Sequence, residues 1–229
     1  MGSIADNLQA VRTRIEAAAK ASGRDPKGIS LLAVSKTWPA ESVRAAALEG
    51  QRAFGENYVQ EGVAKCAALA DLGLEWHFIG PLQSNKTKLV AESFDWVHSI
   101  DRLKVAERLS AQRPAQLPPL QVCIQVNVDG EATKSGCLPG EALALAESVR
   151  RLPRINLRGL MAIPAPADDL AAQRKPLAKL AALAAELRNA GLPIDTLSMG
   201  MSHDLEAAVL EGATVVRVGT AIFGERSHA

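Results

Sequence analysis

The segment Leu31-Leu32-Ala33-Val34-Ser35-Lys36-Thr37-Trp38-Pro39 places one lysine at the end of a short apolar run. Four consecutive apolar residues, followed by a proline and a helical pattern from Ala40, predict a buried strand that leads into a helix. A lysine at such a boundary has an apolar stem and an amine at the edge of a cavity. These surroundings lower the pKa of the amine and favour a Schiff-base nucleophile. The alternative is a lysine whose amine simply extends into solvent.

Two turns in the C-terminal part of the chain combine glycine with hydroxyl side chains. They are Ser198-Met199-Gly200-Met201-Ser202-His203-Asp204 and Arg217-Val218-Gly219-Thr220, and each precedes a helical segment. Backbone N–H groups, hydroxyl groups and helix N-termini attract phosphate. The residues predicted to line such a phosphate site are Ser202, Gly219 and Thr220, with Gly200 allowing close approach of the backbone. The alternative is that the two hydroxyl residues only cap their helices.

Arg217 lies within an apolar strand-like run, between Val216 and Val218. If the two valines face the surrounding helices, strand alternation directs the arginine to the opposite face, into the interior. An unpaired guanidinium there would cost several kcal/mol, so it needs an acceptor. A neutral pyridine-type ring nitrogen would serve, and a nearby carboxylate is the alternative.

The elements that must position these residues alternate regularly along the chain. The strand-like runs are Leu31–Val34, Ala53–Gly55, Trp76–Ile79, Trp96–His98, Gln121–Val128, Leu157–Met161, Thr196–Met199 and Thr214–Val218. Helical sequence follows each of them, which predicts parallel strands joined by crossover helices. We therefore predict an α/β fold in which one (β/α)8 barrel domain spans residues 1–229, preceded by an extra N-terminal helix from Ser3 to about Ser22. An open, doubly wound sheet is the alternative, because alternation fixes parallel pairing and not closure.

The C-terminal ends of the strands in such a barrel share one mouth. Lys36 would follow the first strand and Asn57 the second, while the two phosphate turns would follow the seventh and eighth strands. A lysine for an aldehyde, a cup for a phosphate and a cation for a ring nitrogen are together the features that hold pyridoxal 5′-phosphate (PLP). The sequence therefore predicts PLP as the cofactor.

Composition narrows the class of protein further. The chain has 229 residues, 48% of them hydrophobic, with 26 basic and 25 acidic side chains, so no charge excess favours nucleic acid or an anionic membrane. Three cysteines without Cys-x-x-Cys spacing indicate reduced thiols rather than a disulfide framework. No leader sequence or apolar run of about 20 residues is present. We expect a soluble, cytoplasmic protein, and a monomer.

The sequence assigns no definite function to several polar residues near the predicted strand ends. His77 and His98 are expected to be packed histidines rather than metal ligands, because no cysteine or carboxylate stands beside them at metal-ligand spacing. No metal site is therefore predicted. Glu56 could orient Lys36 or only begin a helix. The other residues without an assigned role are His203, Lys86 and Lys134.

Longer motifs support one family. They are Ser35-Lys36-Thr37, Phe54–Glu61, His77-Phe78-Ile79-Gly80, Gly159–Pro164, Ser198–Asp204 and Val216–Gly224. In these motifs the chain resembles the pyridoxal phosphate homeostasis family over nearly its whole length. The resemblance implies the barrel of the alanine racemase N-terminal domain, with Lys36 carrying PLP as an internal aldimine. It also implies that Asn57 lies beside the ring, that Arg217 faces the pyridine nitrogen, and that Ser202, Gly219 and Thr220 belong to the phosphate site.

The same features argue against turnover. A racemase needs a second base on the opposite face of the substrate carbon, and in alanine racemases an additional β-domain supplies it. This sequence ends at Ala229, soon after the last turn, and Tyr58 is its only tyrosine. An arginine at the ring nitrogen would keep the ring unprotonated and a weak electron sink.

We therefore expect a PLP-binding protein without catalytic residues, which limits the free aldehyde and delivers it to apo PLP-dependent enzymes. One alternative is a weak PLP-dependent amino-acid racemase or lyase. The other is a cofactor-free, aldolase-like barrel in which Lys36 forms its Schiff base with the substrate itself.

Overall fold

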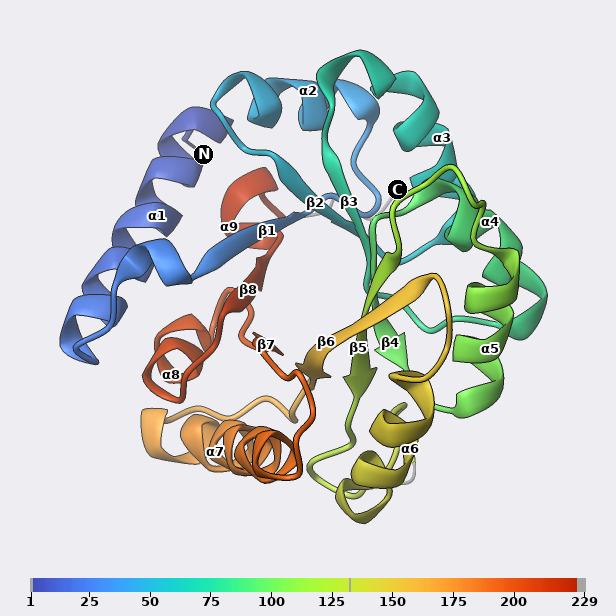
Figure 1. The fold of residues 1–229 in the computed structure, drawn as a ribbon. Coiled ribbons are helices and arrows are strands. Elements are labelled where there is room, and N and C mark those ends of the chain that lie inside the picture. The colour runs from blue at the N-terminus through green and yellow to red at the C-terminus, as the bar shows by residue number, and fades with distance from the viewer. Residues whose placement is uncertain (1, 132, 226–229) are drawn as a thin grey trace.

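Eight parallel strands close into a barrel in the computed structural model, which describes residues 2–131 and 133–225. Each strand pairs with the next in chain order, and β8 closes the ring against β1 (Figure 1). The strands are β1 Ser30–Val34, β2 Ala53–Glu56, β3 Glu75–Phe78, β4 Trp96–Ile100, β5 Leu120–Gln125, β6 Ile155–Met161, β7 Thr196–Ser198 and β8 Val215–Val218. Closure confirms the predicted barrel and excludes the open sheet. The ends of the predicted 1–229 unit, Met1 and residues 226–229, lie outside the described residues.

Helices surround the strands on the outside of the barrel (Figure 1). They are α1 Ile4–Ala21, α2 Ala40–Leu48, α3 Val59–Ala68, α4 Thr87–Ser93, α5 Leu103–Gln112, α6 Ala142–Val149, α7 Leu170–Asn189, α8 Leu205–Leu210 and α9 Thr220–Phe223. Short 3-10 turns add η1 Pro26–Gly28, η2 Ala70–Leu72, η3 Ser84–Lys86 and η4 Pro139–Glu141. The crossover helices keep the strands parallel and leave the strand ends to the connecting loops.

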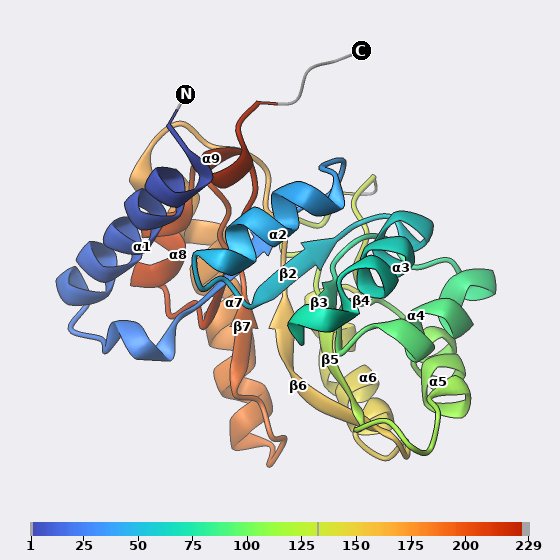
Figure 2. The same ribbon diagram turned by 90° about the horizontal axis from the view of Figure 1, so that it is seen from above.

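The predicted N-terminal helix is an integral part of the outer layer. Ser3 and Asp6 form a capping box that begins α1, and the apolar stripe of Leu8, Val11 and Ile15 is buried. The helix packs beside α8 and α9 (Figure 2). α9 has only four residues, and α1 adds to the outer layer of helices where it contacts α9 and α8.

Strand alternation divides the apolar side chains into two layers. Val216 and Val218 belong to the core between the strands and the helices. A smaller apolar cluster lines the barrel interior and consists of Leu32, Val34, Ile79 and Val215. Arg217 is buried and faces this interior, as the alternation predicts.

The fifth strand is shorter than the predicted Gln121–Val128. It ends at Gln125. Val126 N still donates to Met161 O of β6 at 2.8 Å, and the chain beyond it pairs with its own loop. Asn127 N donates to Cys137 O at 2.9 Å, and Cys137 N donates to Gln125 O at 3.0 Å. The β-branched run that favoured a longer strand instead forms the base of this loop.

The three cysteines are free thiols. Cys123 is fully buried in β5, and burial raises its pKa to about 12, which is consistent with a packing role. None of the helices in the described part of the chain combines the length and hydropathy needed to span a bilayer.

Candidate functional site at the carboxyl ends of the strands

Lys36 lies two residues beyond the end of β1 and is half-buried. Ser35 N donates to Gly55 O of β2 at 3.0 Å, and Trp38 N donates back to Ser35 O at 3.0 Å. The lysine therefore belongs to a tight turn that the barrel edge holds in place. Its predicted location at the exit of the first strand is where the structure puts it.

A buried lysine that the sequence analysis did not single out holds the residue before Lys36. Lys65 of α3 is 5% exposed, and its Nζ lies 2.7 Å from both Ser35 O and Glu56 Oε1. Ser35 Oγ also donates to Glu56 Oε1, at 2.6 Å. The peptide group that leads into Lys36 is thus fixed by a buried ion pair.

The residue after Lys36 is held by the same cluster. Glu61 Oε1 accepts from Lys65 Nζ at 2.7 Å and from Thr37 N at 2.5 Å. Thr37 has a φ of 68°, a left-handed conformation that costs a non-glycine residue about 1–2 kcal/mol. The bond from Glu61 stabilises this turn and so fixes the direction in which the Lys36 side chain leaves the backbone.

Glu56, which the sequence left unassigned, is the carboxylate of this cluster. Burial raises its pKa above the ordinary value, while hydrogen bonds from Lys65 and Ser35 act in the opposite direction. Its second oxygen, Oε2, is buried and meets no hydrogen-bond partner among the described residues. Glu56 therefore anchors the turn and does not begin a helix.

Asn57 follows β2 and is half-buried. Its Oδ1 is buried and has no hydrogen-bond partner within the described residues, although buried amide oxygens are normally paired. Gly80, after β3, lies against its backbone: a Cβ on Gly80 would be 2.2 Å from Asn57 O. The close approach of these two loops fixes Asn57 at the barrel edge.

Substituting Gly80 with alanine tests this contact. The added methyl group must displace the Asn57 backbone, so the variant is expected to lose about 1–3 kcal/mol of unfolding free energy in a denaturant titration. Gly28→Ala is the matched control, because a Cβ on Gly28 meets no atom within 4 Å. Equal stability of the two variants would contradict the close packing of Asn57 and Gly80.

Arg217 uses neutral acceptors inside the barrel. Its Nη1 donates to Ser198 Oγ at 2.8 Å and its Nη2 to Ala162 O at 2.9 Å. Within residues 2–131 and 133–225 no carboxylate forms an ion pair with it, so the predicted carboxylate alternative is not observed there. Burial lowers the pKa of Arg217 to about 10. The register places it opposite Leu32 of β1, close to the strand end that carries Lys36.

The turn after β7 is held by the N-terminal helix. Arg14 of α1 donates to Ser202 O at 2.9 Å and pairs with Glu206 of α8 at 2.7 and 2.8 Å. The N-cap of α8 is Asp204, so the Ser202 hydroxyl is not a helix cap. Gly200 has a φ of 92°, which explains a glycine at this position.

The turn after β8 lies beside the end of β1. A Cβ on Gly219 would be 3.1 Å from Val34 O, so the two loops are in contact. Gly219 is the N-cap of α9 and Thr220 its first residue, so Thr220 is not a cap. The first N–H groups of a helix have no intrahelical acceptor and are open to an anion. Trp38 also stacks on Phe223, with ring centroids 6.0 Å apart, which joins the Lys36 turn to α9.

Other residues near the strand ends have structural surroundings. Lys134 pairs with Asp129 at 2.6 Å and with Glu131 at 3.3 Å, within the loop after β5. His203 is exposed, and Lys86 closes η3. His77 and His98 lie inside the barrel and hydrogen-bond to each other. Among the described residues no group of three or more potential metal ligands is present.

Comparison with known proteins places this arrangement in a family. Residues 6–227 match the family model described as alanine racemase, N-terminal domain. A protein of Pseudomonas aeruginosa named pyridoxal phosphate homeostasis protein is 62% identical over 228 residues, which cover 100% of this chain and 98% of the relative. The chain belongs to the pyridoxal phosphate homeostasis family.

Further matches agree with this family. The pyridoxal phosphate homeostasis protein of Escherichia coli K12 is 56% identical over 232 residues, covering 100% of this chain and 99% of the relative. The solved structure of PipY from Synechococcus elongatus with PLP bound is 38% identical, with a TM-score of 0.84, and covers 97% of this chain and 100% of that chain. The resemblance stated from the motifs is confirmed.

The family motifs do not reveal every residue that shapes this site. Sequence reasoning missed Lys65, and it gave no role to Glu61, the last residue of the motif Phe54–Glu61. Their spacing of four residues on one helix is ordinary for an exposed pair. It also missed Arg14, which reaches the β7 turn from the first helix. One feature of the sequence could have indicated the burial of Lys65. It lies on the same face of α3 as Val59 and Gly62, which are also buried.

Proposed function

We propose that this member of the pyridoxal phosphate homeostasis family binds PLP, with Lys36 as the covalent attachment point. Condensation of the Lys36 amine with an aldehyde forms one C=N bond, and the aldehyde oxygen leaves as water with the two amine hydrogens. PLP supplies the aldehyde and an electron-withdrawing ring. The Lys65 cluster fixes the peptide groups on both sides of Lys36, which supports a nucleophile that must keep one direction.

The observation that carries this proposal is the guanidinium of Arg217, buried in the barrel interior, whose hydrogen bonds within the described residues go to neutral acceptors. Two of its five N–H groups make these bonds, so donors remain for a ring nitrogen. A cation there keeps the nitrogen unprotonated and limits carbanion chemistry. Asn57, with its unpartnered Oδ1, fits a place beside the ring.

The phosphate is proposed to bind at the turns after β7 and β8. Ser202 and Thr220 offer hydroxyl groups that do not cap their helices, and Gly219 brings the start of α9 next to the end of β1. Gly200 keeps the β7 turn in its left-handed conformation. The PipY structure with bound PLP supports the choice of ligand.

The role that follows is retention of PLP rather than turnover. The matched relatives carry homeostasis names, which supports a protein that limits the free aldehyde.

We further propose that the held PLP is passed to apo-enzymes, and that the protein works as a cytoplasmic monomer. Transfer is tested by adding loaded protein to an apo PLP-dependent enzyme in the presence of a phosphatase that destroys free PLP. The loaded protein is expected to reactivate the apo-enzyme to a greater extent than the same amount of free PLP. Equal reactivation by the two would contradict direct transfer.

Absorbance and intact mass test the binding proposal. The protein mixed with PLP is expected to absorb at the violet edge and, after borohydride reduction, to keep one PLP per chain at Lys36. No retained mass would overturn the proposal. Release of product on addition of amino acids would favour the racemase or lyase alternative. A protein that does not bind PLP but forms an imine with a sugar aldehyde would favour the aldolase-like alternative.

A further inference from the structure

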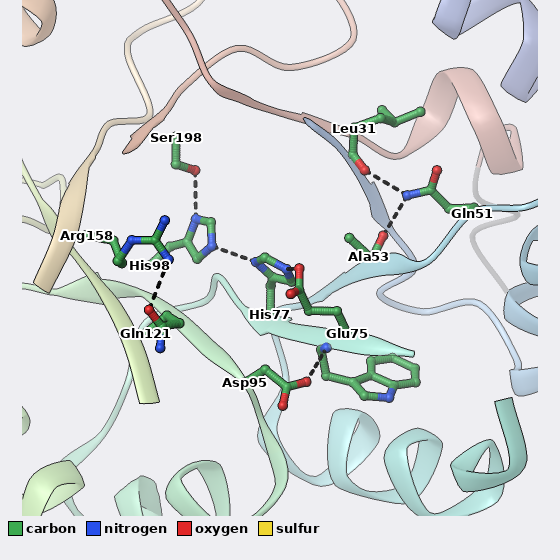
Figure 3. Close-up of polar contacts among 11 residues, drawn as sticks. Leu31, Gln51, Ala53, Glu75, His77, Asp95, His98, Gln121, Arg158 and Ser198 are labelled. Carbon is green, nitrogen blue, oxygen red and sulfur yellow. Dashed lines mark hydrogen bonds and ion pairs between the residues drawn. The ribbon is translucent and has the colours of Figure 1, made fainter. Parts of the chain in front are cut away.

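A continuous chain of hydrogen bonds crosses the barrel interior from its amino-terminal end to Arg217. Figure 3 shows the residues of this chain from Glu75 to Ser198. Glu75 Oε1 lies 2.7 Å from His77 Nε2, and His77 Nδ1 lies 2.9 Å from His98 Nε2. His98 Nδ1 lies 2.7 Å from Ser198 Oγ, which accepts from Arg217 Nη1 at 2.8 Å. The side chains of His77, His98 and Ser198 are buried. Of these contacts, the proposed binding of PLP uses only the one between Arg217 and Ser198.

When both imidazoles are neutral, the carboxylate of Glu75 fixes the direction of every hydrogen bond in this chain. An ionised carboxylate can only accept, so His77 carries its hydrogen on Nε2 and donates to Glu75. Nδ1 of a neutral His77 is then an acceptor, to which His98 donates from Nε2. Nδ1 of a neutral His98 accepts the hydroxyl hydrogen of Ser198, whose Oγ in turn accepts from Arg217.

The surroundings of the chain favour a neutral imidazole at His98. Burial, with the nearby His77 and Arg217, lowers the pKa of His98 well below its usual value. The hydrogen bond from His77 lowers the pKa of Glu75, and Arg158 adds to this effect. Arg217 at one end and Glu75 at the other are thus connected through a neutral His98.

Glu75 stands at the open end of the chain. Its side chain is 52% exposed, at a cleft of about 340 Å³ on the amino-terminal side of the strands. Other charged groups that line this cleft are Lys27, Arg158 and Asp195. Arg158 is occupied by Asp195, at 2.8 Å, and by the Trp96 ring, 5.0 Å away. The acceptor that sets the direction of the chain is therefore at the opposite end of the barrel from Lys36.

We propose that Ser198, His98 and His77 are positioning residues that hold the guanidinium of Arg217 toward the ring of the cofactor, with Glu75 fixing their tautomers. The part concerning the ring rests on the proposed function, whereas the tautomers follow from the protein alone. Ser198 Oγ accepts a hydrogen bond from one N–H group of Arg217. This bond holds the guanidinium, so its other N–H groups keep a single orientation. Loss of this acceptor releases the guanidinium and exposes His98 Nδ1 to an apolar interior.

Nitrogen-15 NMR of the histidine rings in the protein without PLP tests the tautomers. Both His77 and His98 are expected to carry hydrogen on Nε2 and to be neutral at pH 7. Ser198→Ala is expected to shift the Nδ1 resonance of His98. Ser99→Ala is the matched control. Ser99 follows His98 in β4, is also buried, and has an Oγ without a hydrogen-bond partner among the described residues. Hydrogen on Nδ1 of either ring, or a charged ring, would overturn the proposed chain.

The absorption spectrum of the PLP-loaded protein tests the positioning role. Ser198→Ala is expected to shift the absorption band and to weaken PLP binding roughly tenfold, as expected for a lost hydrogen bond to a charged group. Ser198→Thr keeps the hydroxyl group and is expected to restore both, while Ser99→Ala changes neither. A spectrum and affinity of Ser198→Ala equal to those of the natural protein would overturn the positioning role. Failure of the natural protein to bind PLP would instead reject the proposed function and leave the NMR result standing.

Discussion

Replacing Lys36 with alanine is expected to abolish covalent retention of PLP while the barrel stays folded. The turn around residue 36 is held by backbone groups of its neighbours, which Lys65 and Glu61 bind, so the turn persists without the lysine side chain. The free energy of unfolding is expected to change by about 1 kcal/mol or less, as for most residues outside the core. Intact mass after borohydride reduction measures the attachment, and denaturant unfolding measures the fold.

Lys88→Ala is the control for this experiment. Lys88 is exposed on α4, and its one ion pair within the described part of the chain is a long one, of 3.8 Å with Glu92. This variant is expected to retain one reduced PLP per chain, as the natural protein does. If Lys36→Ala also retained it, peptide mapping would place the attachment on another lysine, and the assignment of Lys36 would be wrong.

Much of the fold follows from local sequence. The eight strands were predictable because each is a short apolar run followed by a helical pattern, and eight parallel units favour a closed barrel. Arg217 was predictable as an interior residue because the two adjacent valines have the opposite orientation. The predicted end of β5 at Val128 was wrong. The chain around Gln125 and Asn127 pairs with Cys137 in the following loop, and the residues of the strand do not determine the course of that loop.

The supporting polar contacts of the site were beyond sequence reasoning. The burial of Lys65 depends on where α3 packs against the β1 turn, which no local pattern records. The direction of the chain from Arg217 to Glu75 depends on four contacts between residues on four different strands. His98 and Ser198 are 100 positions apart in sequence, so only the closed barrel brings them together.

Lys65→Met is expected to be the most destabilising substitution near the site. Methionine matches the length of the lysine stem but removes the hydrogen bonds that Lys65 Nζ donates to Ser35, Glu56 and Glu61. Glu56 would remain buried without its counter-charge, and breaking a buried ion pair in this way costs about 3–5 kcal/mol. The midpoint of urea unfolding measures this loss. The rate of PLP attachment is also expected to fall, because the peptide group before Lys36 loses its anchor.

A second substitution separates the charge from the packing. Glu56→Gln in the Lys65→Met background removes the uncompensated carboxylate, so the double variant is expected to regain part of the lost stability. The rate of PLP attachment is not expected to recover with it, because the donor to Ser35 O is still missing. Lys88→Met controls for the replacement of an exposed lysine. If Lys65→Met unfolded at the same urea concentration as this control, the buried ion pair would not be what holds the Lys36 turn.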